Sequence, residues 1–223
     1  MKNGSIIIVG LIILVSGCTD NKNRAGNKQN STGKDSATVE KKKTILFFGN
    51  SLTAGYGLSP SQAFPALIQK KIDSLGLPYQ VINAGVSGET SSGGKTRIDW
   101  ILREPVDIFV LELGANDGLR GTPLSETKKN LQDIIDIVKA KYPTIKLVFA
   151  GMEIPPNMGQ AYTAEFRNIY TDLAAKNNMT LIPFLLQGVG GEPGLNLEDG
   201  IHPNEEGHRI VAENVWKELE KLL

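Results

Sequence analysis

The chain is poor in the residues that build cross-links and most metal sites. Its 223 residues include one cysteine, Cys18, and two histidines, His202 and His208. One cysteine excludes an intrachain disulfide framework and any cysteine-rich zinc or iron–sulfur site. The formal net charge is zero, so the overall charge gives no indication of nucleic-acid binding. Aromatic residues make up only 6% of the chain, but 40% hydrophobic and 22% charged residues are typical of a globular protein.

The chain also lacks a hydrophobic run long enough to span a membrane. Its longest apolar stretch, residues 6–15, follows Lys2 and is shorter than the ~20 residues of a membrane-spanning helix. A cationic start and a short apolar core are typical of a secretory signal peptide. The stretch ends in VSGC at residues 15–18, which resembles the cleavage box of bacterial lipoproteins. The resemblance implies cleavage before Cys18 and lipid on this cysteine, whereas the alternative is an uncleaved anchor with an incidental cysteine.

Residues 19–43 are polar and basic and contain no aromatic side chain. Such a segment buries too little apolar surface to offset the entropy of ordering, so we expect a flexible polar linker. The chain therefore divides into a signal segment with its lipidation site at residues 1–18, the linker, and one domain at residues 44–223.

From residue 44 onward, short apolar runs alternate with segments of helical periodicity. Nearly continuous apolar runs are typical of strands covered on both faces, and we expect five: residues 44–48, 79–83, 108–113, 146–150 and 180–182. Helical spacing of apolar residues predicts helices at residues 63–75, 131–138, 166–173 and from about residue 204 onward. The alternation predicts a three-layer α/β domain with a mostly parallel sheet, in which ligands bind beyond the carboxyl ends of the strands.

Four short motifs lie where such a fold places a ligand. Three follow the first three predicted strands and read GNSLTAGYG at 49–57, NAGVSGET at 83–90 and GANDG at 114–118. The fourth, DGIHP, occupies residues 199–203. In this order the motifs resemble the four blocks of the SGNH (GDSL-type) serine hydrolases, most closely the bacterial arylesterase, thioesterase and lysophospholipase branch. The resemblance covers essentially all of residues 44–223 and implies a three-layer α/β/α fold with a flavodoxin-like five-stranded sheet.

The motifs contain the groups that acyl transfer requires. Ser51 follows a strand directly, so its hydroxyl can face the crevice, where a serine needs an adjacent base. His202 is one of only two imidazoles, and Asp199 is near enough in sequence to orient it. The resemblance implies that Ser51, Asp199 and His202 form a catalytic triad. It also implies that the oxyanion is held by the backbone N–H groups of Ser51 and Gly88 and the side-chain amide of Asn116.

Each of these residues also has a purely structural interpretation. The sequence leaves open an N-cap at Ser51 and a turn residue at Asn116. It also leaves open a conformational role for Gly88 and a structural surface pair of Asp199 and His202.

Three more residues, two within the motifs and one on the last helix, have expected roles. Asn50 departs from the family pattern, which usually has aspartate before the nucleophile. Its amide oxygen can still cap a turn or a helix start, so we expect activity to survive. We expect Asp117 to brace its loop and His208 to be a solvated or capping residue on the last helix. The two histidines do not form the His-Glu-x-x-His pattern, so no metal site is expected.

Together these motifs imply a serine esterase that hydrolyses carboxylic esters or thioesters through an acyl-enzyme and is anchored in the bacterial cell envelope. The expected partners are a small-molecule or lipid ester and, through lipidated Cys18, a membrane, with no cofactor and no nucleic acid. Residues 118–121 and 154–158 are expected to border an acyl chain, and residues 184–186 fit either this border or the core. The alternatives are a carbohydrate or peptidoglycan O-acetyl esterase and a non-catalytic lipoprotein that binds glycan or lipid.

Overall fold

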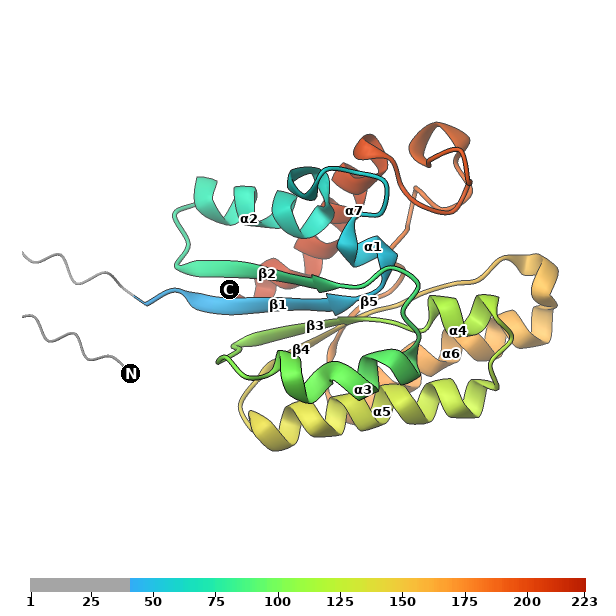
Figure 1. The fold of residues 1–223 in the computed structure, drawn as a ribbon, viewed down its shortest axis with the longest axis horizontal. Helices are drawn as coiled ribbons and strands as arrows, with labels where there is room; N and C mark the ends of the chain where they lie inside the picture. The colour runs from blue at the N-terminus through green and yellow to red at the C-terminus, as the bar shows by residue number, and fades with distance from the viewer. Residues whose placement is uncertain (1–40) are drawn as a thin grey trace, which may run out of the picture. The chain divides into compact units, whose positions relative to one another are not determined.

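A five-stranded parallel sheet forms the centre of residues 41–223, the part of the chain that the computed structural model describes. The strands lie in the order β2-β1-β3-β4-β5 (Figure 1). Their bounds are Lys43–Gly49 for β1, Tyr79–Gly85 for β2, Ile108–Glu112 for β3, Lys146–Ala150 for β4 and Thr180–Ile182 for β5. All four strand pairs are parallel, which confirms the predicted fold class.

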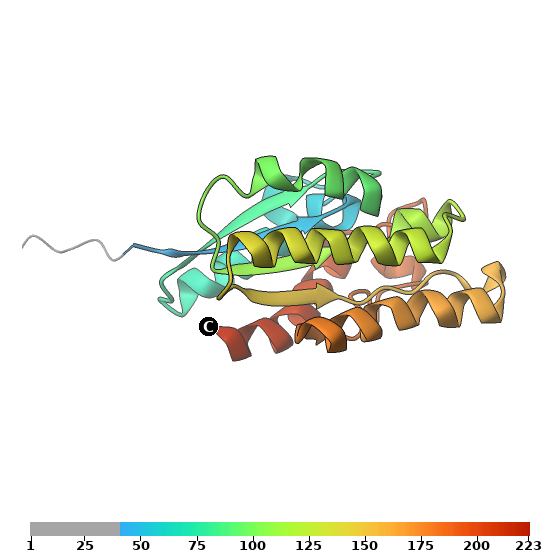
Figure 2. The same ribbon diagram turned by 90° about the horizontal axis from the view of Figure 1, so that it is seen from below.

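Helices cover both faces of this sheet. One face is covered by α2 (Phe64–Ser74) and α7 (Glu205–Leu219) (Figure 1). The other is covered by α3 (Ser91–Ile101), α5 (Leu124–Lys141) and α6 (Gln160–Asn177), and Figure 2 shows α5 and α6 running alongside each other. Two short helices, α1 (Ser51–Ala54) and α4 (Ala115–Leu119), follow β1 and β3. Single 3-10 turns lie at Pro60–Gln62, Pro156–Met158, Pro193–Leu195 and Glu220–Leu222.

The hydrophobic core has two halves because successive side chains of a strand point to opposite faces of the sheet. Phe47 of β1 packs edge-to-face against Phe64 of α2, with ring centroids 5.5 Å apart. Its neighbour Phe48 lies under the Arg97 guanidinium of α3, 4.1 Å from the ring centroid. Both phenylalanines are fully buried, and burial of such a side chain contributes roughly 1.5–3 kcal/mol.

The register of the sheet brings the ends of three strands to one level. Gly49, the last residue of β1, is paired with Gly85 of β2 on one side and with Glu112 of β3 on the other. The segments that follow these strands therefore leave the sheet side by side, and they carry three of the four motifs.

Helix α3 was not among the predicted helices, because its first turns are rich in serine and glycine, which are weak helix formers. Packing explains the glycine at position 94. A Cβ atom there would lie 2.4 Å from Leu113 Cδ1, so this close approach of α3 to the end of β3 excludes a side chain. Thr90 caps the helix by accepting a hydrogen bond from the backbone N–H of Gly93 at 3.2 Å.

The N-terminal expectations fall largely outside the described residues. These include the signal segment, Cys18 and residues 19–40 of the predicted linker. Strand β1 begins at Lys43, one residue earlier than the predicted strand. From residue 41 to residue 223, no helix combines the length and the apolar character that a membrane span requires.

His208 is buried, so of the two roles expected for it, a solvated or a capping residue, only the capping role holds. Only 1% of it is exposed, because its ring stacks on Phe64. Its Nδ1 accepts a hydrogen bond from the backbone N–H of Phe64 at 3.1 Å. That N–H opens α2 and has no partner within its own helix, so His208 caps a helix other than its own. Burial, followed by the charge of His202, lowers the pKa of His208 to about 4.

This burial makes folding sensitive to acid. An unfolded histidine takes up a proton near pH 6.5, whereas folded His208 resists protonation until about pH 4. The free energy of unfolding therefore falls as the pH drops below about 6.5, by about 2 kcal/mol at pH 5 from this residue alone. In His208→Asn the amide oxygen can accept the same hydrogen bond. Between pH 7 and pH 5 we expect this variant to lose about 2 kcal/mol less of its free energy of unfolding than the unaltered protein does. Urea unfolding at both pH values measures it, and equal losses in the two proteins would contradict the assignment.

Candidate active site

Three side chains from distant parts of the sequence form one hydrogen-bonded chain. Ser51 Oγ lies 2.9 Å from His202 Nε2, and His202 Nδ1 lies 2.7 Å from Asp199 Oδ2. The Tyr56 ring packs beside the imidazole, with centroids 4.5 Å apart. The structure thus brings Ser51, His202 and Asp199 together in the order in which a nucleophile, a base and an orienting carboxylate are arranged.

Asp199 and His202 lie in a tight loop that the aspartate itself stabilises. Asp199 Oδ1 accepts hydrogen bonds from the backbone N–H groups of Ile201 at 2.9 Å and His202 at 3.0 Å. Gly200 has a φ of 68°, in the left-handed region that favours glycine. The two backbone N–H groups, together with the imidazole, lower the pKa of Asp199 to about 2. The carboxylate is therefore ionised at neutral pH and available to the ring.

Ser51 is presented by the turn between β1 and α1. It is the first residue of α1 and only 7% exposed. Asn50 is the N-cap, and its Oδ1 accepts a hydrogen bond from the backbone N–H of Leu52 at 2.9 Å. This confirms the expectation that an asparagine here can cap a helix start.

The two other predicted oxyanion residues lie on the neighbouring strand ends. Gly88 follows β2 with a φ of 79°, and this segment is tied to β1 by a hydrogen bond from Val86 N to Gly49 O at 2.9 Å. Asn116 lies in α4, after β3, and its Nδ2 donates to Glu89 O at 2.9 Å. An amide nitrogen carries two hydrogens, so this bond orients the group and leaves the second hydrogen for another acceptor.

Supporting charges around these loops were missed by the sequence reasoning. Glu89 forms an ion pair with Arg97 of α3, and Arg97 also donates to Ala84 O at 2.8 Å. Glu112, at the end of β3, is 1% exposed and bonded to the turn that carries Ser51. Its position inside an otherwise apolar strand was the signal that could have identified it, because a buried charged residue needs partners.

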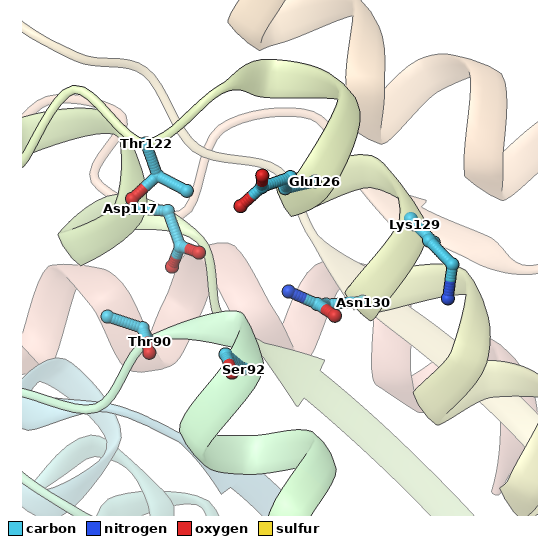
Figure 3. Close-up of a pocket in the computed structure, with 7 residues that line it drawn as sticks. All are labelled: Thr90, Ser92, Asp117, Thr122, Glu126, Lys129 and Asn130. Atoms are coloured by element: carbon cyan, nitrogen blue, oxygen red, sulfur yellow. The ribbon is translucent and has the colours of Figure 1, made fainter.

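Asp117 braces its loop as expected. Its Oδ2 accepts a hydrogen bond from the backbone N–H of Ser91 at 2.8 Å, which joins α4 to the start of α3. A polar cavity of about 280 Å³ lies beside this contact (Figure 3). It is lined by residues of α3, α4 and α5 and their ends, and none of the three hydrogen-bonded residues Ser51, His202 and Asp199 lines it. Within residues 41–223, no group of three or more histidine, cysteine and acidic side chains is placed to hold a metal ion.

Comparison with known families identifies the chain. The profile of the GDSL-like lipase/acylhydrolase family matches residues 47–210. This range lies within the predicted domain and includes all four motifs. The chain belongs to this family. The expected family relationship is therefore confirmed.

Curated relatives cover most of the chain. Esterase TesA of Pseudomonas aeruginosa is 40% identical over 182 residues, which span 81% of this chain and 90% of the relative. The arylesterase of Vibrio mimicus is 35% identical over 189 residues, which span 84% of this chain and 94% of the relative. Thioesterase 1/protease 1/lysophospholipase L1 of Escherichia coli is 37% identical over 181 residues, with 81% and 85% covered.

Solved structures agree with this family assignment. The crystal structure of TesA superimposes with a TM-score of 0.77 at 40% identity and covers 81% of this chain and all of TesA. The esterase EstA from Pseudoalteromonas, solved with monoethylphosphonate as inhibitor, has a TM-score of 0.76 at 31% identity, with 81% and 98% covered.

Proposed function

We propose that this protein is a serine esterase that hydrolyses carboxylic esters and thioesters through an acyl-enzyme. The observation that carries the proposal is the hydrogen-bonded chain from Ser51 through His202 to Asp199. With a proton on Nδ1 directed at the ionised Asp199, the imidazole leaves Nε2 free to accept the Ser51 proton. Ser51 Oγ then attacks the carbonyl carbon of the substrate, and Asp199 stabilises the imidazolium that forms.

The negative charge that develops on the substrate oxygen requires hydrogen-bond donors. We assign this role to the backbone N–H groups of Ser51 and Gly88 and to the free hydrogen of the Asn116 amide. His202 next gives its proton to the departing alcohol or thiol, which leaves the acyl group on Ser51. Water, activated by the same imidazole, attacks this ester and releases the acid.

The surface around Ser51 fits a substrate with an apolar acyl group. Large apolar side chains are exposed on the segments that carry the site, at Tyr56, Val86, Leu119 and Ile201, and also at Met158 in the 3-10 turn after β4. Single exposed apolar residues are common, as at Leu75 and Trp100, so the support comes from finding several of them on the segments that carry the site. Ile154, which was expected at this rim, is buried in the core instead. Leu185 is also buried there, which is one of the two positions that the sequence left open for it.

The relatives support the same substrate class. Their names describe an esterase, an arylesterase and a combined thioesterase and lysophospholipase. Esters and thioesters share a polarised carbonyl next to a leaving group, so one nucleophile and one set of oxyanion donors serves both.

Ser51→Ala and His202→Ala test the proposed mechanism directly. Each variant should lower kcat for a small aryl ester at least about 10⁴-fold, because either change removes nucleophilic attack. Circular dichroism should remain unchanged, and a serine-directed phosphonate should label the unaltered protein but not Ser51→Ala. Ser92→Ala, a change in the neighbouring cavity, is the matched control and should retain turnover. Undiminished activity of folded Ser51→Ala would refute the proposal.

Asn116→Ala tests the oxyanion assignment. The amide gains most from the charged intermediate and little from the ground-state carbonyl, so kcat should fall on the order of 10²–10³-fold while KM changes little. Asn130→Ala, which removes an amide from the neighbouring cavity, is the control. A turn residue would behave differently: the melting temperature would fall and kcat of the folded fraction would remain normal.

We further infer that the esterase is a lipoprotein of the bacterial cell envelope, anchored through Cys18. The VSGC box and the short apolar stretch before it support this inference. Cys18→Ser should abolish incorporation of labelled fatty acid and remove the mature protein from the membrane fraction, while Ser16→Ala, a small residue for a small residue, should preserve both. Fatty acid still attached to the Cys18→Ser protein would disprove the anchor.

A further inference from the structure

Glu112 is a buried carboxyl group at the base of the candidate site, and the mechanism above does not use it. It is 1% exposed and ends β3, directly beside Gly49 of β1. Three donors surround it. Asn50 Nδ2 donates to Oε1 at 2.7 Å, and the Asn50 backbone N–H and Thr53 Oγ1 donate to Oε2 at 3.0 and 2.8 Å. This set of donors fits an ionised carboxylate, which only accepts hydrogen bonds.

These bonds determine which way the Asn50 amide faces. With Nδ2 held by Glu112, Oδ1 is directed at the backbone N–H of Leu52 and lies 3.4 Å from Ser51 Oγ. A flipped amide would place its NH₂ group against the Leu52 N–H and would lose both hydrogen bonds. The Glu112 carboxylate thus holds the residues on either side of Ser51. It binds Asn50 directly, and it holds Leu52 through the side-chain amide of Asn50.

We propose that Glu112 is a positioning residue for the nucleophile, whose carboxylate fixes the Asn50 amide and thereby the turn that presents Ser51. The inference rests on the proposed role of Ser51. In this pair the Asn50 amide donates a hydrogen bond to the Glu112 carboxylate and so holds the turn. No proton has to be shared between the two groups, as it would be between two carboxylates. Glu112 itself does not touch the substrate.

The surroundings of the pair make its charge state important. Burial raises the pKa of Glu112 to about 7, although the hydrogen bonds from Thr53 and Asn50 lower it. Two other ionisable groups lie close by: Arg97 of α3 donates to Gly49 O at 3.4 Å, and Tyr170 of α6 donates to Leu113 O at 3.1 Å. A second carboxylate at position 50 would face Glu112 across the same 2.7 Å contact, so the two groups would have to share a proton.

Exchange of the two groups provides the experiment. In Asn50→Asp the shared proton replaces the amide N–H, so kcat should match the unaltered enzyme near neutral pH. Loss of this proton should then lower kcat on the order of tenfold by about pH 10, with KM little changed. Glu112→Gln places two amides face to face and should lower kcat about 10-fold to 100-fold at every pH. The double variant Asn50→Asp/Glu112→Gln restores one donor and one acceptor, so it should recover most of kcat and show no alkaline decline.

The controls separate this inference from a general loss of stability and from the proposed function. Asn177→Asp buries a new carboxylate far from Ser51, at the end of α6, and should leave the pH profile of kcat unchanged. The positioning role is overturned if kcat of Asn50→Asp has the same pH profile as that of the unaltered enzyme, or if the double variant is no more active than Glu112→Gln. Either result leaves the proposed esterase function unaffected. If the unaltered protein has no turnover, or if Ser51→Ala keeps it, the proposed function itself fails. If Glu112→Gln does not fold, the positioning role is still tested by whether kcat of Asn50→Asp declines at alkaline pH.

Discussion

The common level at which β1, β2 and β3 end is the constraint on which the rest of the site depends. Gly49 is paired with Gly85 and Glu112, so three loops leave the sheet side by side. Contacts between the loops are then short. Val86 N reaches Gly49 O, and the Asn116 amide reaches Glu89 O. A shift of one strand by a single residue would reverse the faces of its side chains and separate these groups.

Two carboxylates at the site differ because their surroundings differ. Asp199 lies in a partly exposed loop, where two backbone N–H groups and the imidazole lower its pKa to about 2. Glu112 is buried under the nucleophile turn, where the loss of water raises its pKa to about 7 in spite of three hydrogen-bond donors. One group is ionised throughout the neutral range and suited to orient a base. The other is sensitive to any change in the donors around it.

The fold could be predicted largely from the sequence because its elements follow strong local patterns. The apolar runs identified all five strands, and the helical spacing identified α2, α5, α6 and α7. Helix α3 could not be found this way, since its serines and glycines are weak helix formers. Its helical state depends on the Thr90 cap and on close packing over Leu113, which local patterns do not encode.

The sequence by itself determined which groups are available for chemistry: one serine after the first strand, few imidazoles, and an aspartate three residues before His202. Their meeting was decided only by the tertiary structure, because Ser51 and His202 are 151 residues apart and their contact depends on how β1 and the C-terminal loop are packed. The role of Glu112 was hidden for the same reason. A glutamate in an apolar strand has no visible partner in the sequence, and the donors of Asn50 and Thr53 reach it only once β1 and β3 lie side by side.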